Sequence, residues 1–391
     1  MHELLAPIVG TENLQTIESK LWVTPPSQTQ MAAVVKLCHD RRWQIGIVGQ
    51  GSKLAWGNSL QGADLVLSTA KLHRLIDHSQ GDLTITVEAG YKFAELQSFL
   101  AQYQQCLGID PPYREHCSIG GVVATGESGS WRQRYNSVRD QILGIKFIRS
   151  DGEIVKAGGR VVKNVAGYDL MKLLTGSYGT LGIITEVCFR LYPLPSPRVF
   201  YLCQGEAEQM QKLRSVLLRS PLTPLSLDLY SPYLLQQLGY AAKWGIGIEL
   251  AGVATEFASN LLTEIVNNLG IARQIIEGDF NRSVSQIFER NGRCKMGVPS
   301  AQAIEVFAQI ADRYPLQIHL GSGLGLLLLA DQAEVSYWRQ QLTRLGGFLT
   351  EQGRVRDSIN SQVRQMMAKI KQQFDPLNLL NPATYDPTPI L

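Results

Sequence analysis

The sequence predicts an α+β fold made of two domains and a C-terminal segment. Its 391 residues exceed what one ordinary hydrophobic core holds, and the apolar fraction of 45% is typical of globular chains. The first half alternates short helical patterns with many strand patterns, and the second half alternates longer helices with strands, as in an antiparallel sheet with helices on one face. We therefore expect domains at 1–197 and 198–350, followed by a separate segment at 351–391.

In the first domain, apolar spacing and turn residues define each element. The stretch 24–44 begins a helix, because Ser27 and Gln30 form a capping box and apolar residues follow at helical spacing through Cys38, which we interpret as a core thiol. The later elements are expected in this order: strands at 45–49, 63–69 and 81–90, with a helix at 92–103, a hairpin at 142–159 and a strand at 181–195 that ends in prolines.

The second domain is predicted from longer periodic segments. The spacing of apolar residues indicates helices at 206–220 and 255–270, and strands at 245–253, 292–300 and 316–330. In the tail, 363–382 is typical of a helix followed by a turn rich in proline and asparagine.

Composition excludes several classes of protein. A net charge of +3 is too small and too evenly spread to indicate binding of nucleic acid. The N-terminus lacks the basic start and apolar core of a signal peptide, and the longest apolar run, 324–330, is too short to span a bilayer. We therefore expect a cytoplasmic protein without a membrane span.

The cysteines and histidines show no spacing that is typical of metal sites. The six cysteines are scattered along the chain, so neither a zinc nor an iron–sulfur pattern is present. His73 and His78 are expected at the surface. Any redox chemistry would then come from an organic cofactor.

The stretch "IGIVGQGSKLAWGN" at 45–58 contains the first glycine-rich loop. It is not a P-loop, because Ser52 stands where the lysine would be and Lys53 comes one position late. It is not a Rossmann fingerprint either, because Leu54 replaces the third glycine. The breakers that follow it indicate a strand–loop–strand element, whose loop is either a plain turn or a nest of backbone N–H groups for an anion.

Two further segments, 117–145 and 159–187, are also dense in glycine. In the first of them we argue against a helix, because each interior glycine costs about 1 kcal/mol relative to alanine. Small residues with free backbone N–H groups can instead surround a large flat ligand at contact distance. Loops near 50, 120 and 180 together suggest one extended ligand, for which an adenine dinucleotide is long enough.

Taken together, these runs are recognisable. "GQGSKLAWG", "TVEAG", "SIGGVVATGESGSWRQRYNSVRDQILGI", "GGRVVKNVAGYDLMKLLTGSYGTLGIITEV" and the tail "FDPLNLLNP" resemble the FAD-binding (PCMH-type) oxidoreductases of the vanillyl-alcohol oxidase type. Within that group they are most similar to the E subunits of glycolate oxidase, of which the Val-Lys-Asn-Val-Ala-Gly-Tyr-Asp run is characteristic. The resemblance is strong over 20–195, weaker in the tail and vague over 200–350.

The resemblance implies a PCMH-type FAD-binding domain of two α+β subdomains, an α+β cap domain with an antiparallel sheet, and a C-terminal segment that packs back on the FAD domain. It also implies that the first loop is a ligand loop, which holds the FAD diphosphate. No residue of 49–54 is His or Cys, so FAD is expected to be noncovalent. The residues that match FAD-binding positions are Gly49, Gln50, Gly51, Ser52, Lys53 and Leu54 in the first stretch, Ser118, Ile119, Gly120, Gly121, Thr125, Gly126 and Ser128 in the second, and Gly182, Ile183 and Ile184 in the third.

By the same resemblance, the function would be that of an FAD-binding subunit in a glycolate oxidase-type complex. Such a complex oxidises a small 2-hydroxy acid (glycolate to glyoxylate), and the expected partners are a second flavoprotein subunit and an iron–sulfur subunit. A stand-alone FAD-dependent D-2-hydroxy-acid dehydrogenase of the D-lactate type is one alternative. A non-catalytic scaffold that has lost the flavin is another, although intact glycines in all the loops argue against it.

The catalytic base and the cation for the substrate carboxylate are not identified from the sequence. Relatives of the hydroxy-acid branch carry a His-rich metal motif in the cap, whereas "HLGSGLG" at 319–325 has one histidine with no acid beside it, and we interpret His319 as structural. Arg132 and Arg134 are expected at the surface. Four polar residues could face the flavin or a partner, or could simply cap turns: Lys163, Asn164, Tyr168 and Asp169.

Overall fold

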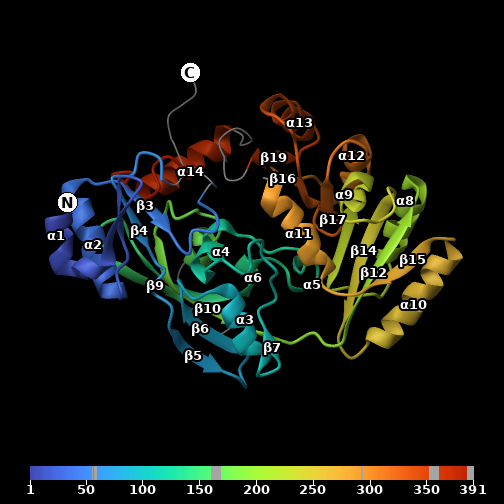
Figure 1. The fold of residues 1–391 in the computed structure, drawn as a ribbon, viewed down its shortest axis with the longest axis horizontal. Helices are drawn as coiled ribbons and strands as arrows, with labels where there is room; N and C mark the ends of the chain where they lie inside the picture. The colour runs from blue at the N-terminus through green and yellow to red at the C-terminus, as the bar shows by residue number, and fades with distance from the viewer. Residues whose placement is uncertain (55, 57–59, 160–168, 292–293, 352–360, 385–391) are drawn as a thin grey trace. The chain divides into compact units, whose positions relative to one another are not determined.

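The computed structural model describes residues 1–54, 56, 60–159, 169–291, 294–351 and 361–384 (Figure 1). The chain divides into two compact units. The first comprises Met1–Ser128, Ser137–Leu194 and Gly353–Leu391, and the second comprises Gly129–Asn136 and Pro195–Gln352. Each unit combines helices with sheets, so the predicted α+β class is confirmed.

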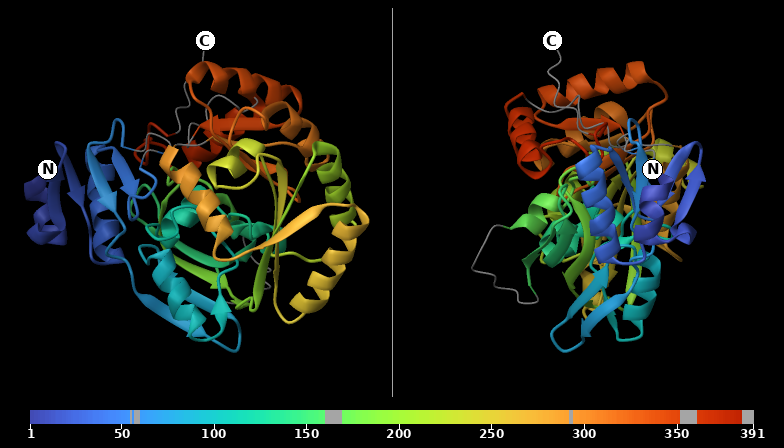
Figure 2. Two further views of the ribbon diagram at one scale, coloured as in Figure 1. Left: turned by 45° about the vertical axis from the view of Figure 1, so that its right-hand side comes forward. Right: turned by 90° about the vertical axis from the view of Figure 1, so that its left-hand side faces the viewer.

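The first unit contains a four-stranded sheet in the order β1-β2-β4-β3. Its strands are β1 (Leu14–Ile17), β2 (Lys20–Val23), β3 (Ile45–Val48) and β4 (Leu65–Ser68). Helices α1 (His2–Val9) and α2 (Gln28–Arg41) pack beside each other against it (Figure 2). The predicted start of α2 is confirmed, because the Ser27 side chain accepts a hydrogen bond from the backbone N–H of Gln30.

A second sheet of the first unit has five antiparallel strands in the order β5-β6-β10-β8-β9. Its strands are β5 (Leu75–Ser79), β6 (Thr84–Glu88), β8 (Ile142–Ile148), β9 (Ile154–Gly158) and β10 (Ile183–Arg190). The predicted hairpin is the pair β8–β9. The core against this sheet includes side chains of α3 (Phe93–Ala101), α4 (Ile119–Thr125), α6 (Val138–Gln141) and α7 (Leu170–Leu174). Two short strands, β7 (Gln105–Cys106) and β11 (Tyr192–Pro193), form a separate antiparallel pair.

The second unit is built on an eight-stranded sheet in the order β15-β12-β14-β13-β17-β18-β16-β19. Its strands are β12 (Arg198–Gly205), β13 (Ser226–Tyr230), β14 (Trp244–Ala251), β15 (Ala272–Ile276), β16 (Cys294–Gly297), β17 (Leu316–His319), β18 (Leu324–Leu327) and β19 (Phe348–Glu351). The neighbouring pairs are antiparallel, as predicted. The single strand expected at 316–330 is in fact two strands, β17 and β18, because Gly323 turns the chain with φ +71°.

Helices cover the two faces of this sheet unequally. The main core joins one face to α8 (Ala207–Leu217), α10 (Thr255–Asn268), α12 (Ala303–Ile310) and α13 (Gln332–Arg344) (Figure 1). A smaller apolar cluster on the other face contains residues of α9 (Pro232–Gln237) and α11 (Phe280–Asn291). The short helix α5 (Arg132–Tyr135) also belongs to this unit.

The C-terminal segment completes the first unit. After α14 (Ser361–Phe374), residue Leu380 forms a parallel bridge with Ile45 of β3. The backbone of Ile45 donates to the carbonyl of Leu379 at 2.7 Å and accepts from Asn381 at 2.9 Å. This segment therefore lies beside β3, directly before the first glycine-rich loop.

Candidate functional site

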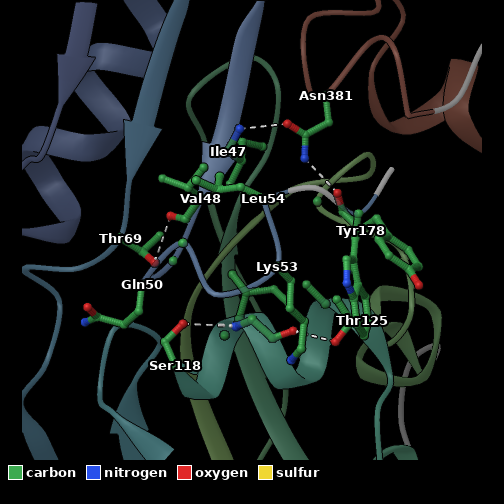
Figure 3. Close-up of a pocket in the computed structure, with 18 of the residues that line it drawn as sticks. Ile47, Val48, Gln50, Lys53, Leu54, Thr69, Ser118, Thr125, Tyr178 and Asn381 are labelled. Atoms are coloured by element: carbon green, nitrogen blue, oxygen red, sulfur yellow. Dashed lines mark hydrogen bonds between the residues drawn. The ribbon is translucent and has the colours of Figure 1, made fainter. Parts of the chain in front are cut away.

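A pocket in the first unit is lined by residues from five parts of the chain. These are β3 with the loop that follows it, Thr69 directly after β4, helix α4 with its N-cap, the segment that leads into β10, and the C-terminal segment (Figure 3). Lys53 lies in this loop, and its ammonium group is 5.5 Å from the ring centroid of Trp56. Segments distant in sequence thus form one concave surface.

The loop after β3 presents backbone donors to this pocket. Gly51 has φ +78°, a conformation that favours glycine, and the turn is closed by the Leu54 N–H, which donates to the Gly51 carbonyl at 3.3 Å. Within the part of the chain that the structure describes, the N–H groups of Gln50, Gly51 and Ser52 form no hydrogen bond. Consecutive free N–H groups in such a turn form a nest that suits an anion.

Helix α4 provides the facing wall, and it corrects our argument against a helix in this segment. Ser118 caps it by accepting from the Gly121 N–H at 3.3 Å. A Cβ on Gly120 would lie 2.8 Å from the Cβ of Ala89, and a Cβ on Gly49 would collide with the Ser118 hydroxyl. Gly49 and Gly120 therefore allow contacts that any larger residue would prevent, and helix α4 forms although a glycine inside a helix, such as Gly120, costs about 1 kcal/mol relative to alanine.

The third wall is the segment that leads into β10. Tyr178, Gly179, Gly182 and Ile184 line the pocket there. A Cβ on Gly182 would lie 2.7 Å from the ring of Phe147, so this glycine is required by the packing of the sheet itself.

The fourth wall is fixed by Asn381. Its side-chain oxygen accepts from the Ile47 N–H at 2.7 Å, and its side-chain nitrogen donates to the Tyr178 carbonyl at 2.7 Å (Figure 3). It thereby links β3, the third wall and the C-terminal segment. Thr384 lines the pocket beside it.

A buried ion pair holds this C-terminal wall in place. The Lys371 ammonium lies 2.6 Å from the Asp375 carboxylate, and their side chains are 5% and 0% exposed. The ammonium also donates to the carbonyls of Thr180 and Leu380, while Asp375 accepts from the backbone of Leu379 and Leu380. Burial lowers the pKa of Lys371, and the charge of Asp375 acts in the opposite direction.

Most of the predicted site residues come together in this pocket. Those that line it are Gly49, Gln50, Gly51, Ser52, Lys53, Leu54, Ser118, Gly120, Gly121, Thr125, Gly182 and Ile184. The remaining predicted residues are not among its lining residues. Ile119 and Ile183 are buried in the core, Gly126 ends α4 with φ +65°, and Ser128 accepts from the Val138 N–H at 2.9 Å.

Sequence reasoning missed several lining residues. They are Ile47, Val48, Trp56, Thr69, Ala124, Tyr178, Gly179, Asn381 and Thr384. Ile47 and Val48 directly precede the loop, so their position in the strand could have indicated them. Asn381 and Thr384 reach the pocket only through the long-range contacts of the C-terminal segment, and the tail "FDPLNLLNP" was the one available signal.

Other candidate residues lie elsewhere. Lys163, Asn164 and Tyr168 fall outside the described residues, and Asp169 precedes α7 and pairs with Lys172 at 2.8 Å. Arg134 donates to the Ala251 carbonyl at 3.2 Å within the second unit. Among the described residues no group of His, Cys, Asp and Glu side chains could hold a metal ion, and no described helix is long and apolar enough to cross a membrane.

The pocket residues fit a dinucleotide with a flat ring system. The free N–H groups and Lys53 suit a diphosphate, while the side chains of Gln50, Ser118 and Thr125 offer hydrogen-bonding groups. Apolar side chains such as Ile184 supply contact area for a ring.

A comparison with protein families indicates which class of proteins the chain resembles. Residues 19–158 match the family of FAD binding domains, and this range contains the first glycine-rich loop and α4. Most of this range lies in the first unit, and the chain is thus similar to FAD binding domains and to FAD-dependent oxidoreductases.

Among curated proteins, the chain is similar to flavoenzymes that act on 2-hydroxy acids by name, over part of their length. The chain is 36% identical over 204 residues to the glycolate oxidase subunit GlcE of Escherichia coli, with 52% of this chain and 56% of that protein covered. It is 36% identical over 191 residues to a probable mitochondrial D-lactate dehydrogenase of Danio rerio, with 48% and 38% covered. The chain thus spans only about a third to a half of the length of the curated relatives it matches.

Solved structures confirm the fold over nearly the whole chain. The structure of p-cresol methylhydroxylase with substrate bound gives a TM-score of 0.78 at 15% identity and covers 98% of this chain and 96% of that one. The 4-ethylphenol oxidase of Gulosibacter chungangensis gives a TM-score of 0.76 at 14% identity, with 100% and 97% covered. The predicted α+β fold with a large antiparallel sheet is therefore confirmed, and it is the fold of these two enzymes.

Proposed function

We propose that the protein is an FAD-binding subunit of a glycolate oxidase-type complex, which oxidises a small 2-hydroxy acid such as glycolate. The observation that carries this proposal is the loop 49–54, whose free backbone N–H groups line the same pocket as α4. The similarity to GlcE supports the choice of complex. When bound, FAD would accept the hydride from the carbinol carbon of the acid.

In this proposal, the chain holds the cofactor by backbone and side-chain contacts without a covalent bond. The N–H groups of Gln50, Gly51 and Ser52 and the Lys53 ammonium would bind the diphosphate. No pocket-lining residue among those described is His or Cys, the usual residues of covalent flavin links. Asn381 would keep the C-terminal wall closed against the loop.

We further propose that the partners are a second flavoprotein subunit and an iron–sulfur subunit. Two relatives support an assembly, because they are named as glycolate oxidase subunits: GlcE of Escherichia coli and GlcD of Bacillus subtilis, the latter 28% identical over 176 residues. The second candidate is a stand-alone D-lactate-type dehydrogenase, which the similarity to the Danio rerio protein favours.

The substitution Gly121→Val tests the pocket assignment. At Gly121 an added Cβ would meet only the Ser118 hydroxyl, at 3.2 Å, and valine has a higher helix propensity than glycine, so the protein should fold. Its side chain would occupy ligand space at an overpacking cost of about 1–3 kcal/mol, a loss of about 5- to 150-fold in FAD affinity. The measurement is the flavin absorbance of the purified protein and its titration with FAD.

Gly81→Val is the matched control. Gly81 belongs to the same unit and has no atom within 4 Å of an added Cβ, and it does not line the pocket. We expect it to bind FAD like the wild type. Equal FAD affinity in the Gly121→Val protein would show that the pocket is wrongly assigned. Anaerobic addition of glycolate or D-lactate to the yellow wild type then distinguishes the candidates, because only a self-sufficient dehydrogenase is bleached without its partners.

A further inference from the structure

Strand β15 forms one edge of the eight-stranded sheet in the second unit (Figure 1). It pairs with β12 on its inner side, and within the described ranges of the chain no other strand pairs with it. Among the same residues, no further backbone hydrogen bond reaches the residues of β15. An open edge of this kind offers a row of N–H and C=O groups with which another strand can pair. β15 is therefore a surface to which a strand of another molecule can be added.

Alternate side chains of this strand point to the face that the main core covers. Arg273 lies opposite Cys203 and Ile275 opposite Tyr201, and both partners belong to that core. Because directly opposite residues point to the same side of a sheet, Arg273 and Ile275 share this face. Glu277 directly follows the strand, and the two-residue period of an extended chain predicts the same side for it. The edge thus presents a cation, an apolar side chain and an anion in order along one face.

The second unit leaves these three side chains without suitable partners. Ile275 is 61% exposed, although it lies opposite the buried Tyr201. The Arg273 guanidinium lies 5.1 Å from the ring centroid of Tyr201, and it forms no ion pair within the part of the chain that the structure describes. Glu277 is exposed and forms neither a hydrogen bond nor an ion pair among those same residues. Both charges therefore remain available to another molecule.

A second copy of the same strand complements this order of side chains. In an antiparallel pair related by a two-fold axis, each residue lies opposite the one that is equally far beyond the axis. With the axis at Ile275, the two isoleucines face each other, and Arg273 of each chain lies opposite Glu277 of the other. Such opposite charges and apolar pairs stabilise paired strands. Moving the axis by one residue either way would set Ile275 opposite a charged residue and separate the two charges.

Helix α10 adds exposed apolar surface beside this edge. It packs on the same face of the sheet, because its residues Leu262 and Val266 belong to the main core, and it contacts β15. The first turn of α10 carries Phe257, whose side chain is 71% exposed. In the antiparallel pair both copies of α10 would lie on one side of the joined sheet, where aromatic side chains suit the centre of an interface.

We propose that the protein associates with a second copy of itself through β15, in an antiparallel strand pair centred on Ile275. The sheet is then continuous across the two chains, and two equivalent ion pairs form between Arg273 of one chain and Glu277 of the other. The proposal concerns the surface of the second unit alone, so it holds whether or not the proposed function is correct.

Sedimentation of the full chain by analytical ultracentrifugation over a range of concentrations tests this association. The wild type should sediment as a dimer that dissociates on dilution. Arg273→Glu and Glu277→Arg each set like charges opposite each other at two equivalent places, so each should raise the dissociation constant about tenfold or more. The double substitution restores opposite charges in reversed order and should return the dissociation constant to nearly the wild-type value.

Ile275→Lys should abolish the dimer, because it places two ammonium groups at the two-fold axis. Its matched control is Ile76→Lys, since Ile76 is an exposed isoleucine on β5, the edge strand of the five-stranded sheet in the first unit. The control should remain a dimer, and circular dichroism shows whether each variant is folded. A wild type that stays monomeric at every concentration would overturn the proposal, as would a double substitution that dimerises no better than the single ones.

Cross-linking tests the register of the strand pair independently of its affinity. Directly opposite residues of antiparallel strands have Cα atoms about 4.5–5.5 Å apart, within the reach of a disulfide. Ile275→Cys should therefore form a disulfide between two chains under mild oxidation. Gln274→Cys should not, because the two copies of that residue would lie diagonally about 7–8 Å apart. The six native cysteines are buried, so the introduced thiol is the one that reacts. Cross-linking through Gln274→Cys, or its absence in both variants, would overturn the pairing centred on Ile275.

Discussion

The glycine-rich pocket of the first unit and one face of the eight-stranded sheet in the second unit are built in opposite ways. That sheet face, the polar face, carries the residues of three register pairs, which are Ser226 with Glu249, Asp228 with His319, and Tyr230 with Gln317. The pocket presents backbone, because Gly49 and Gly120 remove the side chains that would separate the loop from α4 and α4 from the strand end at Ala89. The polar face presents side chains, and Asp228, Glu249 and His319 come from three different strands. A site made of backbone leaves a local signature in the sequence, whereas a site assembled across strands leaves none.

The substitution Asp375→Asn tests whether the glycine-rich pocket depends on the buried charge pair between Lys371 and Asp375. Removing one partner of a buried pair leaves the other charge uncompensated, at a cost of about 3–5 kcal/mol. We expect that loss in the free energy of unfolding, measured in urea, together with weaker FAD retention, because Asp375 anchors the segment that carries Asn381.

Asp40→Asn is a closely matched control. Lys36 and Asp40 have the same i,i+4 spacing in the same unit, but their side chains are 63% and 55% exposed. Exposed pairs contribute about 0–1 kcal/mol, so this change should be nearly neutral. Equal effects of the two substitutions would mean that the glycine-rich loops support the pocket without the C-terminal wall.

The sequence allowed the strands around the pocket and most of its lining to be predicted, because the signals there are local. The strand at 45–49, the hairpin and the loop 49–54 are each set by neighbours in the chain. The helix α4 was missed because helix propensity ignores the packing of Gly120 against Ala89. Asn381 and the Asp228–His319 pair could not be predicted, since only sheet registers and tertiary contacts bring them to their partners.

The substitution Glu249→Gln tests how a buried carboxyl group of the polar face affects the stability of the protein. Burial is the main cause that raises the pKa of Glu249 above its ordinary value of 4.5, and the charge of Arg198 opposes it. The folded protein therefore holds this proton more tightly than the unfolded chain. From pH 4.5 up to the raised pKa, the wild type should lose stability as pH rises, because the unfolded chain ionises first.

Glutamine removes this titration and keeps the shape of the side chain. We therefore expect the variant to show a flatter decline of unfolding free energy over that pH range, measured by urea denaturation at several pH values, with a smaller effect than that of Asp375→Asn. Identical pH dependence in the two proteins would indicate that the network around Glu249 stabilises its charged form after all.

The smallest expected effect concerns the reactivity of two buried thiols, Cys38 in the first unit and Cys203 in the second. Their rates of labelling compare how often the core of each unit unfolds locally. Both side chains are 0% exposed, and burial raises the pKa of each thiol to about 12. Because the thiolate is the reactive form, a thiol reagent near neutral pH should label neither until the surrounding core opens. Labelling followed by mass spectrometry should show that both thiols are protected in buffer and modified in urea. The variants Cys38→Ala and Cys203→Ala identify which signal belongs to which thiol. Rapid labelling of Cys203 alone would mean that the main core of the second unit opens more readily than the core around α2 in the first unit, so that the sheet carrying the Asp228–His319 pair is the less rigid of the two.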